Sequence, residues 1–363
     1  MSDSLLTAVS TYGAAGSSAR VRILDWLAHL RLPARMLDYA GTADNSLGSL
    51  ASRPGHLVAA EFKLRVVEAR KSQSGAVIIS RSASPFSNGR LEAALLKSWE
   101  HSVYDFDDAL FDSPEHGASK LWSKRRVWER AVPNADVVIA GSDYLAERAS
   151  RFSANVVMIP SCVNPDSYEL KTDYSIQSAY PTAVWLGSPS TEQYLQRISE
   201  PLLTLHRTRA LRLKVISAGD RSLGALDQMV DRVAWSRDGF PGHLAGADVG
   251  IMPLPDEPYA RGKCAYKLLQ YGAAGLPVVA SPVGANELAL RRMGGVAATD
   301  GGWREALDSL LRATAYERRA AGVRARAAVV ENYSFDAWAS AWQSTVMQNR
   351  TRSSDSDPRG QVS

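Results

Sequence analysis

The residues Asp248–Gly284 read DVGIMPLPDEPYARGKCAYKLLQYGAAGLPVVASPVG and carry the clearest signal of architecture in the chain. They open with a short apolar run over 249–252, which is typical of a buried strand, and continue through a loop rich in proline and acidic residues. A helical segment follows over 263–274 and ends at Gly275, before a second apolar strand over 278–281. A strand, a helix and another buried strand in this order indicate a parallel sheet covered by helices.

The same alternation of short apolar runs and helical segments, among them a predicted helix over 192–205, occupies both halves of the chain. A polar, proline-bounded segment, Pro165–Pro181, interrupts it and is typical of an interdomain linker. We therefore predict two α/β domains rather than one large sheet. The further predicted strands are 5–10, 35–39, 76–80, 102–106, 136–140 and 155–159 in the first half, and 183–186, 213–217 and 232–235 in the second.

These patterns divide the chain into five parts. We predict an N-terminal domain over 1–165, a linker over 166–181 and a C-terminal domain over 182–332. An amphipathic helix over 333–349 follows the second domain and is expected to pack across the domain junction. The last part, 350–363, is polar and is predicted to be a disordered tail.

The overall composition of the 363 residues is 45% hydrophobic and 22% charged, which is typical of a soluble globular protein with substantial cores. No run of about 18 uncharged apolar residues occurs, and the N-terminus lacks the basic start of a signal peptide. We therefore expect a cytoplasmic protein. Cys162 and Cys264 have no metal-type partner spacing and are expected to be small core residues.

The net charge of the chain is +4 and its pI is near 9.0. This charge permits attraction to phosphates or to an anionic membrane face without demanding nucleic acid, so no nucleic-acid partner is expected. Much of the arginine excess lies in Glu317–Arg326, which we interpret as a solvated helix face. Peripheral association of the protein with the inner face of the membrane is left as an alternative.

In each predicted domain, one glycine-containing loop follows the first strand. These loops are Gly13–Ser18 in the first domain and Gly187–Thr191 in the second. Loops of this kind bind anions, because the N–H groups of a helix N-terminus carry partial positive charge and glycine lets a phosphate approach closely. Neither loop is a dinucleotide fingerprint or a P-loop. A tight turn and a plainly capped helix are the alternative interpretations, and the equivalent placement of both loops favours a shared ligand.

The third candidate is the loop that leads into the helix predicted over 263–274. Arg261 and Lys263 lie at the start of this helix. A cation at a helix start opposes the helix dipole, which is unfavourable for stability but suits a bound diphosphate. An ordinary charged surface is the alternative.

The stretch Lys263–Gly284 resembles the signature of the group 1 (family 4) retaining glycosyltransferases. Their fold, GT-B, has two Rossmann-like α/β domains facing across a cleft, with a C-terminal helix that crosses back to the first domain. The resemblance implies an N-terminal domain on the acceptor side and a C-terminal domain that binds a nucleotide sugar. It extends to the stretches Tyr12–Leu30, Tyr104–Ala109, Ala140–Ser142 and Val184–Ser190.

On the donor side, the resemblance implies that Gly13 and Gly16 face the phosphates and the transferred sugar. It places Gly187 and Ser188 near the diphosphate from the other side. Trp235, at the end of a predicted strand, borders the nucleotide base in this interpretation or is an ordinary core tryptophan.

The paired glutamates of the family, eight residues apart, correspond to Gly262 and Gln270 here, so both carboxylates are missing. The amide oxygen of Gln270 could still hold the ribose, whereas Gly262 has no side chain to contact the sugar. We expect Arg261, Lys263 and Lys267 to supply positive charge to the donor instead.

An acidic run, Asp105 to Asp108, ends a predicted strand of the first domain. Asp105 and Asp107 are candidate catalytic residues together with Arg261 and Lys263, and Asp107 is expected to accept a hydrogen bond from the attacking hydroxyl. Helix capping, with pairing to downstream cations, is an equal alternative, and a two-metal site is disfavoured. Tyr104, Asp108 and His101 are the remaining acceptor-side candidates.

The resemblance thus implies a transferase of carbohydrate biosynthesis, which moves a sugar from a nucleotide-diphosphate sugar to a hydroxyl acceptor with retention. The acceptor could be a glycan, a lipid-linked or a small molecule, and no metal or other cofactor is expected. The missing glutamates favour one alternative, a non-catalytic nucleotide-sugar-binding relative. A sugar epimerase or phosphorylase on the same fold is another.

Overall fold

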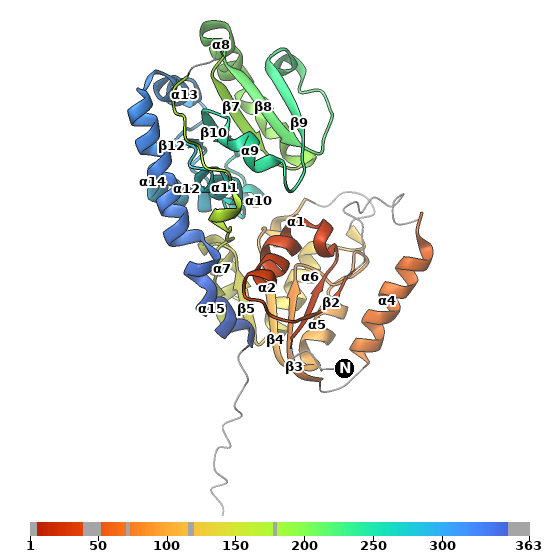
Figure 1. Ribbon diagram of the computed structural model, residues 1–363. Coiled ribbons are helices and arrows are strands. Elements are labelled where there is room, and N and C mark those ends of the chain that lie inside the picture. Colours follow the sequence, from red (N-terminus) through yellow and green to blue (C-terminus); the bar gives the residue numbers. More distant parts are fainter. Residues whose placement is uncertain (1–5, 39–51, 70–72, 115–119, 177–179, 348–363) are drawn as a thin grey trace, which may run out of the picture.

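The computed structural model describes residues 6–38, 52–69, 73–114, 120–176 and 180–347, and the predicted tail 350–363 lies outside these ranges. Two sheets, each of six strands, form the centres of two domains (Figure 1). Every printed pairing between their strands is parallel, as the sequence predicts. Parallel strands are buried on both faces and therefore appear in the sequence as continuous apolar runs.

The N-terminal sheet has the order β2-β1-β3-β4-β5-β6. A helix that follows β1 runs from Ser17 to His29 through a π-helical turn over 20–24. Further helices are α4 (Pro54–Glu68), α5 (Arg90–Lys97), α6 (Lys124–Ala131) and α7 (Asp143–Ser150). The strands are β1 (Leu6–Ser10), β2 (Arg35–Leu37), β3 (Gln73–Ser80), β4 (Trp99–Phe106), β5 (Val137–Ala140) and β6 (Val156–Met158).

The C-terminal sheet has the order β12-β11-β10-β7-β8-β9, in which the direction of strand addition reverses between β7 and β10. Ligands of open α/β sheets bind beyond the carboxyl ends of the strands at such a reversal. The strands are β7 (Thr182–Leu186), β8 (Arg212–Ser217), β9 (Val230–Ala234), β10 (Val249–Met252), β11 (Val278–Ala280) and β12 (Val296–Ala297). The helices are α8 (Ser199–Arg209), α9 (Phe240–Ala245), α10 (Pro258–Arg261), α11 (Tyr266–Ala273), α12 (Ala285–Met293) and α13 (Trp303–Arg312).

Two predicted helices differ in the structure. The helix predicted over 192–205 is a 3-10 helix, Pro189–Ile198, followed by α8. The helix predicted over 263–274 is split into α10 and α11, and Ala265 between them has a positive φ of 55°. The split has a tertiary cause, because the residues between the two helices reach across to the first domain.

The segment predicted as a linker packs against the second domain where it is described. The backbone N–H of Lys171 donates to the carbonyl of Ala274 over 2.9 Å, and the Tyr174 hydroxyl donates to the carbonyl of Gly275 over 2.7 Å. These bonds satisfy carbonyls at the C-terminal end of α11, which have no partner within the helix. The polar residues of this segment therefore serve as a helix cap.

The last two helices connect the domains. Helix α14 (Ala315–Tyr333) packs on α11 and α12, and α15 (Phe335–Met347) continues onto the first domain (Figure 1). There the rings of Trp342 and Trp26 stack at 5.3 Å, and Phe335 meets Trp26 edge-on at 4.7 Å. The predicted crossing of a C-terminal helix back to the first domain is thus confirmed.

Candidate functional site

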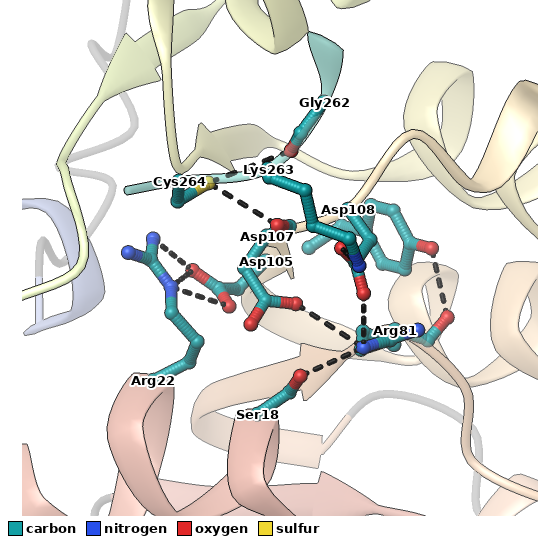
Figure 2. A network of polar contacts seen from close by, with 10 residues as sticks. Ser18, Arg22, Arg81, Asp105, Asp107, Asp108, Gly262, Lys263 and Cys264 are labelled. Carbon is teal, nitrogen blue, oxygen red and sulfur yellow. Dashed lines mark hydrogen bonds and ion pairs between the residues drawn. The ribbon is translucent and has the colours of Figure 1, made fainter. Parts of the chain in front are cut away.

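The loops that follow β4 and β10 bring the two domains into direct contact at Gly262, Lys263 and Cys264 (Figure 2). The Nζ atom of Lys263 lies 2.7 Å from Oδ1 of Asp108, and the thiol of Cys264 donates to the carbonyl of Asp107 over 3.1 Å. Gly262 lies so close to Ala109 that a Cβ atom on Gly262 would come within 2.5 Å of the Ala109 backbone nitrogen. The carboxyl edges of the two sheets therefore meet here.

Arg81 joins the acidic run to the helix after β1. Its Nη1 atom lies 2.8 Å from Asp108, 3.5 Å from Asp107 and 2.7 Å from the Ser18 hydroxyl (Figure 2). Arg81 has a φ of 63°, an unusual value for a residue other than glycine, and its carbonyl accepts a hydrogen bond from Tyr104. Such local strain is typical of functional positions.

The charges around Asp108 set its pKa. Burial alone would raise the pKa, but the neighbouring charges of Lys263 and Arg81 hold it below its ordinary value. Burial would lower the pKa of Lys263, and the charge of Asp108 raises it instead. Both groups are therefore charged at neutral pH, as an ion pair between the domains.

Asp105 lies apart from this group, in a buried ion pair with Arg22. The Nη2 atom of Arg22 lies 2.7 Å from Oδ2 of Asp105, and Nη1 donates to the carbonyl of Ile159 over 2.9 Å. Both side chains are inaccessible to solvent. The prediction that Asp105 is a catalytic residue is corrected, because this carboxylate cannot reach a substrate.

Two acceptor-side predictions also need correction. His101 lies near the start of β4, away from Asp107, where its Nε2 pairs with the carbonyl of Thr345 in α15 at 2.8 Å. Tyr104 is buried and its hydroxyl holds the Arg81 carbonyl. Alternate residues of a strand face opposite sides of the sheet, and the two ends of a strand are far apart. Residues close to Asp107 in the sequence therefore need not lie close to it in the structure. Asp107 and Asp108 remain on the site.

The three cations expected to serve the donor have different surroundings. Arg261 lies on the surface, with its Nε 2.6 Å from Oδ1 of Asp256, and Lys263 pairs with Asp108. Lys267 has no hydrogen bond or ion pair within the described ranges. Its Nζ lies 5.4 Å from the centre of the Trp185 ring, and a Cβ atom on Gly187 would come within 2.8 Å of its Cε.

The surroundings of Lys267 also lower its pKa. Burial, and then the positive charge of Lys263, lower the pKa of Lys267 to about 8, while Asp108 acts weakly in the opposite direction. A lysine held in this way next to a glycine loop is poised to gain an anionic partner. Of the three cations, Lys267 is therefore the one without a carboxylate partner among the described residues.

The backbone conformation of the two glycine loops allows a ligand to approach them closely. Gly13 has a φ of 48°, and a side chain there would overlap the carboxylate of Asp38. Gly16 precedes α1 in an extended conformation. On the other domain, Gly187 precedes Ser188, whose hydroxyl is exposed beside Ser190 at 3.1 Å, at the start of the 3-10 helix.

The domains meet a second time at Trp235. The guanidinium of Arg20 lies 5.1 Å from the centre of the Trp235 ring, and Arg237 Nη2 lies 2.9 Å from Oδ1 of Asp25. Trp235 also stacks on Phe240, with ring centres 6.3 Å apart. The Trp235 ring therefore lies at the junction of the domains, where it is also partly buried against the core of the second domain.

Gln270 lies beneath this second contact, in a buried group of polar side chains. Gln270 and Tyr266 lie close enough to the hydroxyl of Tyr168 to act on its pKa. Burial raises the pKa of Tyr168 to about 12, so this hydroxyl stays protonated.

Sequence reasoning missed Ser18, Arg22 and Arg81. Ser18 and Arg22 are four residues apart on the helix after the Gly13 loop, a spacing that puts both on one face. Arg81 directly follows β3, a neighbour of β1 and β4 in the sheet. This placement at a strand end was the available signal for Arg81.

The described part of the chain holds no group of three or more side chains from His, Cys, Asp and Glu that could bind a metal ion. Its two cysteines are free and buried, as predicted. Among the described helices, none combines the length and the apolar character that crossing a bilayer requires.

Comparison with known proteins agrees with this geometry. Residues 181–313 match the family Glycosyl transferases group 1. The Bacillus subtilis (strain 168) protein TuaH, assigned as a glycosyltransferase of teichuronic acid biosynthesis, is 28% identical over 204 residues. That alignment covers 51% of this chain and 51% of TuaH, so the chain spans about half the length of this relative.

The whole fold is similar to solved structures at low sequence identity. Sucrose-phosphate synthase from Thermosynechococcus elongatus is 15% identical, with a TM-score of 0.68 and coverage of 93% of this chain and 96% of that protein. Anabaena Alr3699/HepE, solved in complex with UDP-glucose, is 15% identical, with a TM-score of 0.65 and coverage of 94% and 98%. The predicted GT-B fold, with two parallel α/β domains, is confirmed.

Proposed function

We propose that this chain, whose residues 181–313 match the group 1 glycosyltransferases and whose fold is GT-B, transfers a sugar from a nucleotide-diphosphate sugar to a hydroxyl acceptor. The observation that carries the proposal is Lys267, an uncompensated lysine beside the Gly187 loop. A diphosphate at this loop would supply the missing negative charge. Its oxygens would also accept from N–H groups at the start of the 3-10 helix Pro189–Ile198.

The chemistry of transfer needs stabilisation of the departing diphosphate. Lys267 and the loop N–H groups are fixed before the reaction, so they stabilise developing charge without reorganising. We propose retention at the anomeric carbon, with a phosphate oxygen of the leaving group taking the proton of the acceptor hydroxyl. No protein nucleophile is then required, which is consistent with the ion-paired state of Asp105 and Asp108.

Asp107 is proposed to orient the acceptor hydroxyl. It is the carboxylate of the acidic run with the longest ion-pair contact, 3.5 Å from Arg81. Asp108, in contrast, has a cation within 3 Å on either side. Asp107 therefore keeps the most capacity to accept a further hydrogen bond.

We propose a uridine nucleotide as the donor, because the similar Alr3699/HepE structure contains UDP-glucose. The base would lie near Trp235 and the ribose near Gln270. The Gln270 amide has both a donor and an acceptor with which to bind a ribose hydroxyl. The cationic group of Lys267 takes the place of a metal ion in this scheme.

The acceptor is proposed to enter from the first domain. A cavity of about 350 Å³ lies between α4 and the loop before α5, and its walls include the carboxylate of Glu61, the amide of Asn88 and the ring of Phe86. Polar groups around an aromatic ring are suited to a sugar, whose faces are apolar and whose edges are hydroxyls. A glycan acceptor in carbohydrate biosynthesis fits this lining.

A second candidate function is nucleotide-sugar binding without transfer. Gly262 favours it, because the position that holds a glutamate in the family has no side chain here and no room for one beside Ala109. Such a protein would bind the donor through Lys267 and release no nucleoside diphosphate with any acceptor.

The two functions are separated by measuring release of nucleoside diphosphate from UDP-sugars, with and without a glycan and lipid extract as acceptor. Transfer predicts release that depends on the extract and falls at least about tenfold in Lys267→Met. Arg261→Met is the matched control and should keep the wild-type rate, since Arg261 pairs on the surface. Donor binding without release would establish the second function. Isomerised donor, or cleavage that needs phosphate, would instead identify an epimerase or a phosphorylase.

A further inference from the structure

Arg20 reaches from the first domain to the Trp235 ring of the second. Its guanidinium carbon lies 5.1 Å from the centre of that ring, and the side chain is half-buried. None of its guanidinium N–H groups has a hydrogen-bond partner among the described residues. Contact with an aromatic face leaves a guanidinium most of its hydrogen-bonding capacity, because the group has five N–H donors. Arg20 therefore brings unused donors to the junction of the domains.

A carboxylate close to Arg20 is bonded elsewhere. Asp25 lies on the same helix, five residues further along, and its Oδ1 is 2.9 Å from Nη2 of Arg237. Burial raises the pKa of Asp25, and the charges of Arg237 and Arg20 act against this rise. Asp25 thus attracts Arg20 to the junction without using its N–H groups.

The helix that carries Arg20 is irregular at this residue. Between Ser17 and His29 it changes to a π-helical turn over 20–24, and this turn begins with Arg20. Single π-helical turns within α-helices are frequent at functional sites. The helix lies on the side of the first domain that faces the second (Figure 1). The irregular turn therefore coincides with the contact to Trp235.

Aromatic side chains of the second domain surround this contact. The ring of Phe240 lies 6.3 Å from that of Trp235 and 5.8 Å from that of Tyr168. Burial raises the pKa of Tyr168 and of Tyr266, and the charge of Arg20 acts against both shifts, so these hydroxyls also lie close to the junction. Rings with polar groups between them are suited to a planar base, which is apolar on its faces and polar at its edge.

We infer that Arg20 is a specificity-determining residue, which recognises a carbonyl group of the donor base. This inference rests on the proposed function, which puts the base near Trp235. A guanidinium donates hydrogen bonds and accepts none, so it can pair with a carbonyl oxygen but not with an amino group. Uracil, like thymine, has a carbonyl at the ring position where cytosine has an amino group. The substrate class is therefore a uridine rather than a cytidine nucleotide sugar.

The origin of Arg20 in the first domain has a further consequence. The other residues proposed to contact the nucleoside, Trp235 and Gln270, belong to the second domain. Separation of the domains would take Arg20 away from Trp235. The base is then recognised in full only while the domains are together.

The test is calorimetric titration of the full chain with UDP, CDP and inorganic diphosphate, without added metal. The wild type should bind UDP about tenfold or more tightly than CDP, because the cytosine amino group cannot accept a hydrogen bond from Arg20. Arg20→Met should weaken binding of UDP until the two nucleotides bind about equally. It should leave the affinity for inorganic diphosphate unchanged, since that ligand has no base. Thermal melting checks that the variant stays folded.

The matched control is Arg35→Met. Arg35 is exposed and pairs in register with Thr7 near the start of β1, so it lies at the opposite edge of the sheet. This variant should bind all three ligands like the wild type. Equal binding of UDP and CDP by the wild type, or an unchanged preference in Arg20→Met, would overturn the inference. So would an equal loss of diphosphate binding in Arg20→Met, which would assign Arg20 to the phosphates.

Failure of this inference is distinct from failure of the proposed function. Binding of all three ligands by the wild type without preference for UDP would refute the role of Arg20 and leave the donor site in place. Absence of binding by any of them to the folded chain would refute the donor site, and the role of Arg20 with it.

Discussion

The ammonium of Lys263 in the second domain lies 2.7 Å from the Asp108 carboxylate in the first. The pair is mostly shielded from solvent, and Arg81 contacts the other oxygen of the same carboxylate. Asp108 pairs with two cations. Removing Asp108 and removing one of these cations should therefore have unequal effects on the stability of the chain. This contact between the domains is therefore built around one carboxylate.

Asp108→Asn should destabilise the chain more than Lys263→Met. The first change leaves Lys263 without a carboxylate partner and Arg81 with only its 3.5 Å contact to Asp107, and it should cost roughly 3 kcal/mol of unfolding free energy. The second leaves Asp108 with Arg81 and should cost roughly 1–3 kcal/mol. Urea unfolding followed by tryptophan fluorescence measures both, and the reverse order would contradict the assignment. The exposed pair of Arg261 with Asp256 provides a control, and Arg261→Met should change stability by less than about 1 kcal/mol.

Arg22→Met should destabilise the first domain by about 3–5 kcal/mol, because it leaves the Asp105 carboxylate buried without a partner. Asp105→Asn should have a similar effect, and the double variant Arg22→Met, Asp105→Asn should lose less unfolding free energy than the sum of the two single variants. Arg151→Met, which removes an exposed ion pair with Glu147, is the control. Donor binding by the folded fraction of Asp105→Asn should be normal. A loss of turnover without a loss of stability would return Asp105 to the catalytic residues.

Gly262→Glu restores the carboxylate that the family places there, and it should not increase activity. The Cβ atom of any residue at this position meets the backbone of Ala109, so the domains must separate to admit it. We expect a larger radius of gyration in small-angle scattering and weaker donor binding. Gly301→Glu, at a glycine with open space around its Cβ, is the control. A gain in transfer rate with an unchanged scattering profile would show that the position is open.

Donor affinity should depend on pH through Lys267. Burial and the charge of Lys263 lower its pKa to about 8, so the ammonium is charged below that pH and neutral above it. The diphosphate binds the charged form, and affinity should therefore be full near about pH 7 and fall as the pH rises toward about 9. Lys267→Arg should remove this dependence, because a guanidinium stays charged throughout. An identical pH profile in both proteins would assign the titration to another group.

Most of the fold could be predicted because parallel strands such as β4 and β10 are buried on both faces, which leaves continuous apolar runs in the sequence. The end of a helix was predicted at Gly275, where a positive φ of 71° needs glycine. The break between α10 and α11 could not be predicted. Its cause is the contact of Lys263 and Cys264 with a domain more than 150 positions away in the sequence.

The candidate site was predicted only in part, for the same reason. The loops of Gly13 and Gly187 carry a local signal, since their glycines follow strands. The role of an isolated basic residue depends on its partner instead. Arg22 lies 83 positions from Asp105, and Arg81 lies 26 positions from Asp107, so no local pattern marks either pair.

The most direct test of the proposed donor site is calorimetric titration of the full chain with UDP-glucose and a panel of other nucleotide sugars, without added metal. One nucleotide should bind saturably, and at 100 times its dissociation constant it should stabilise the fold by roughly 2.7 kcal/mol. Lys267→Met should weaken this binding by about tenfold or more, while Arg261→Met should not change it. Absence of binding by any nucleotide to the folded protein, or equal binding by Lys267→Met, would contradict a donor site built on Lys267.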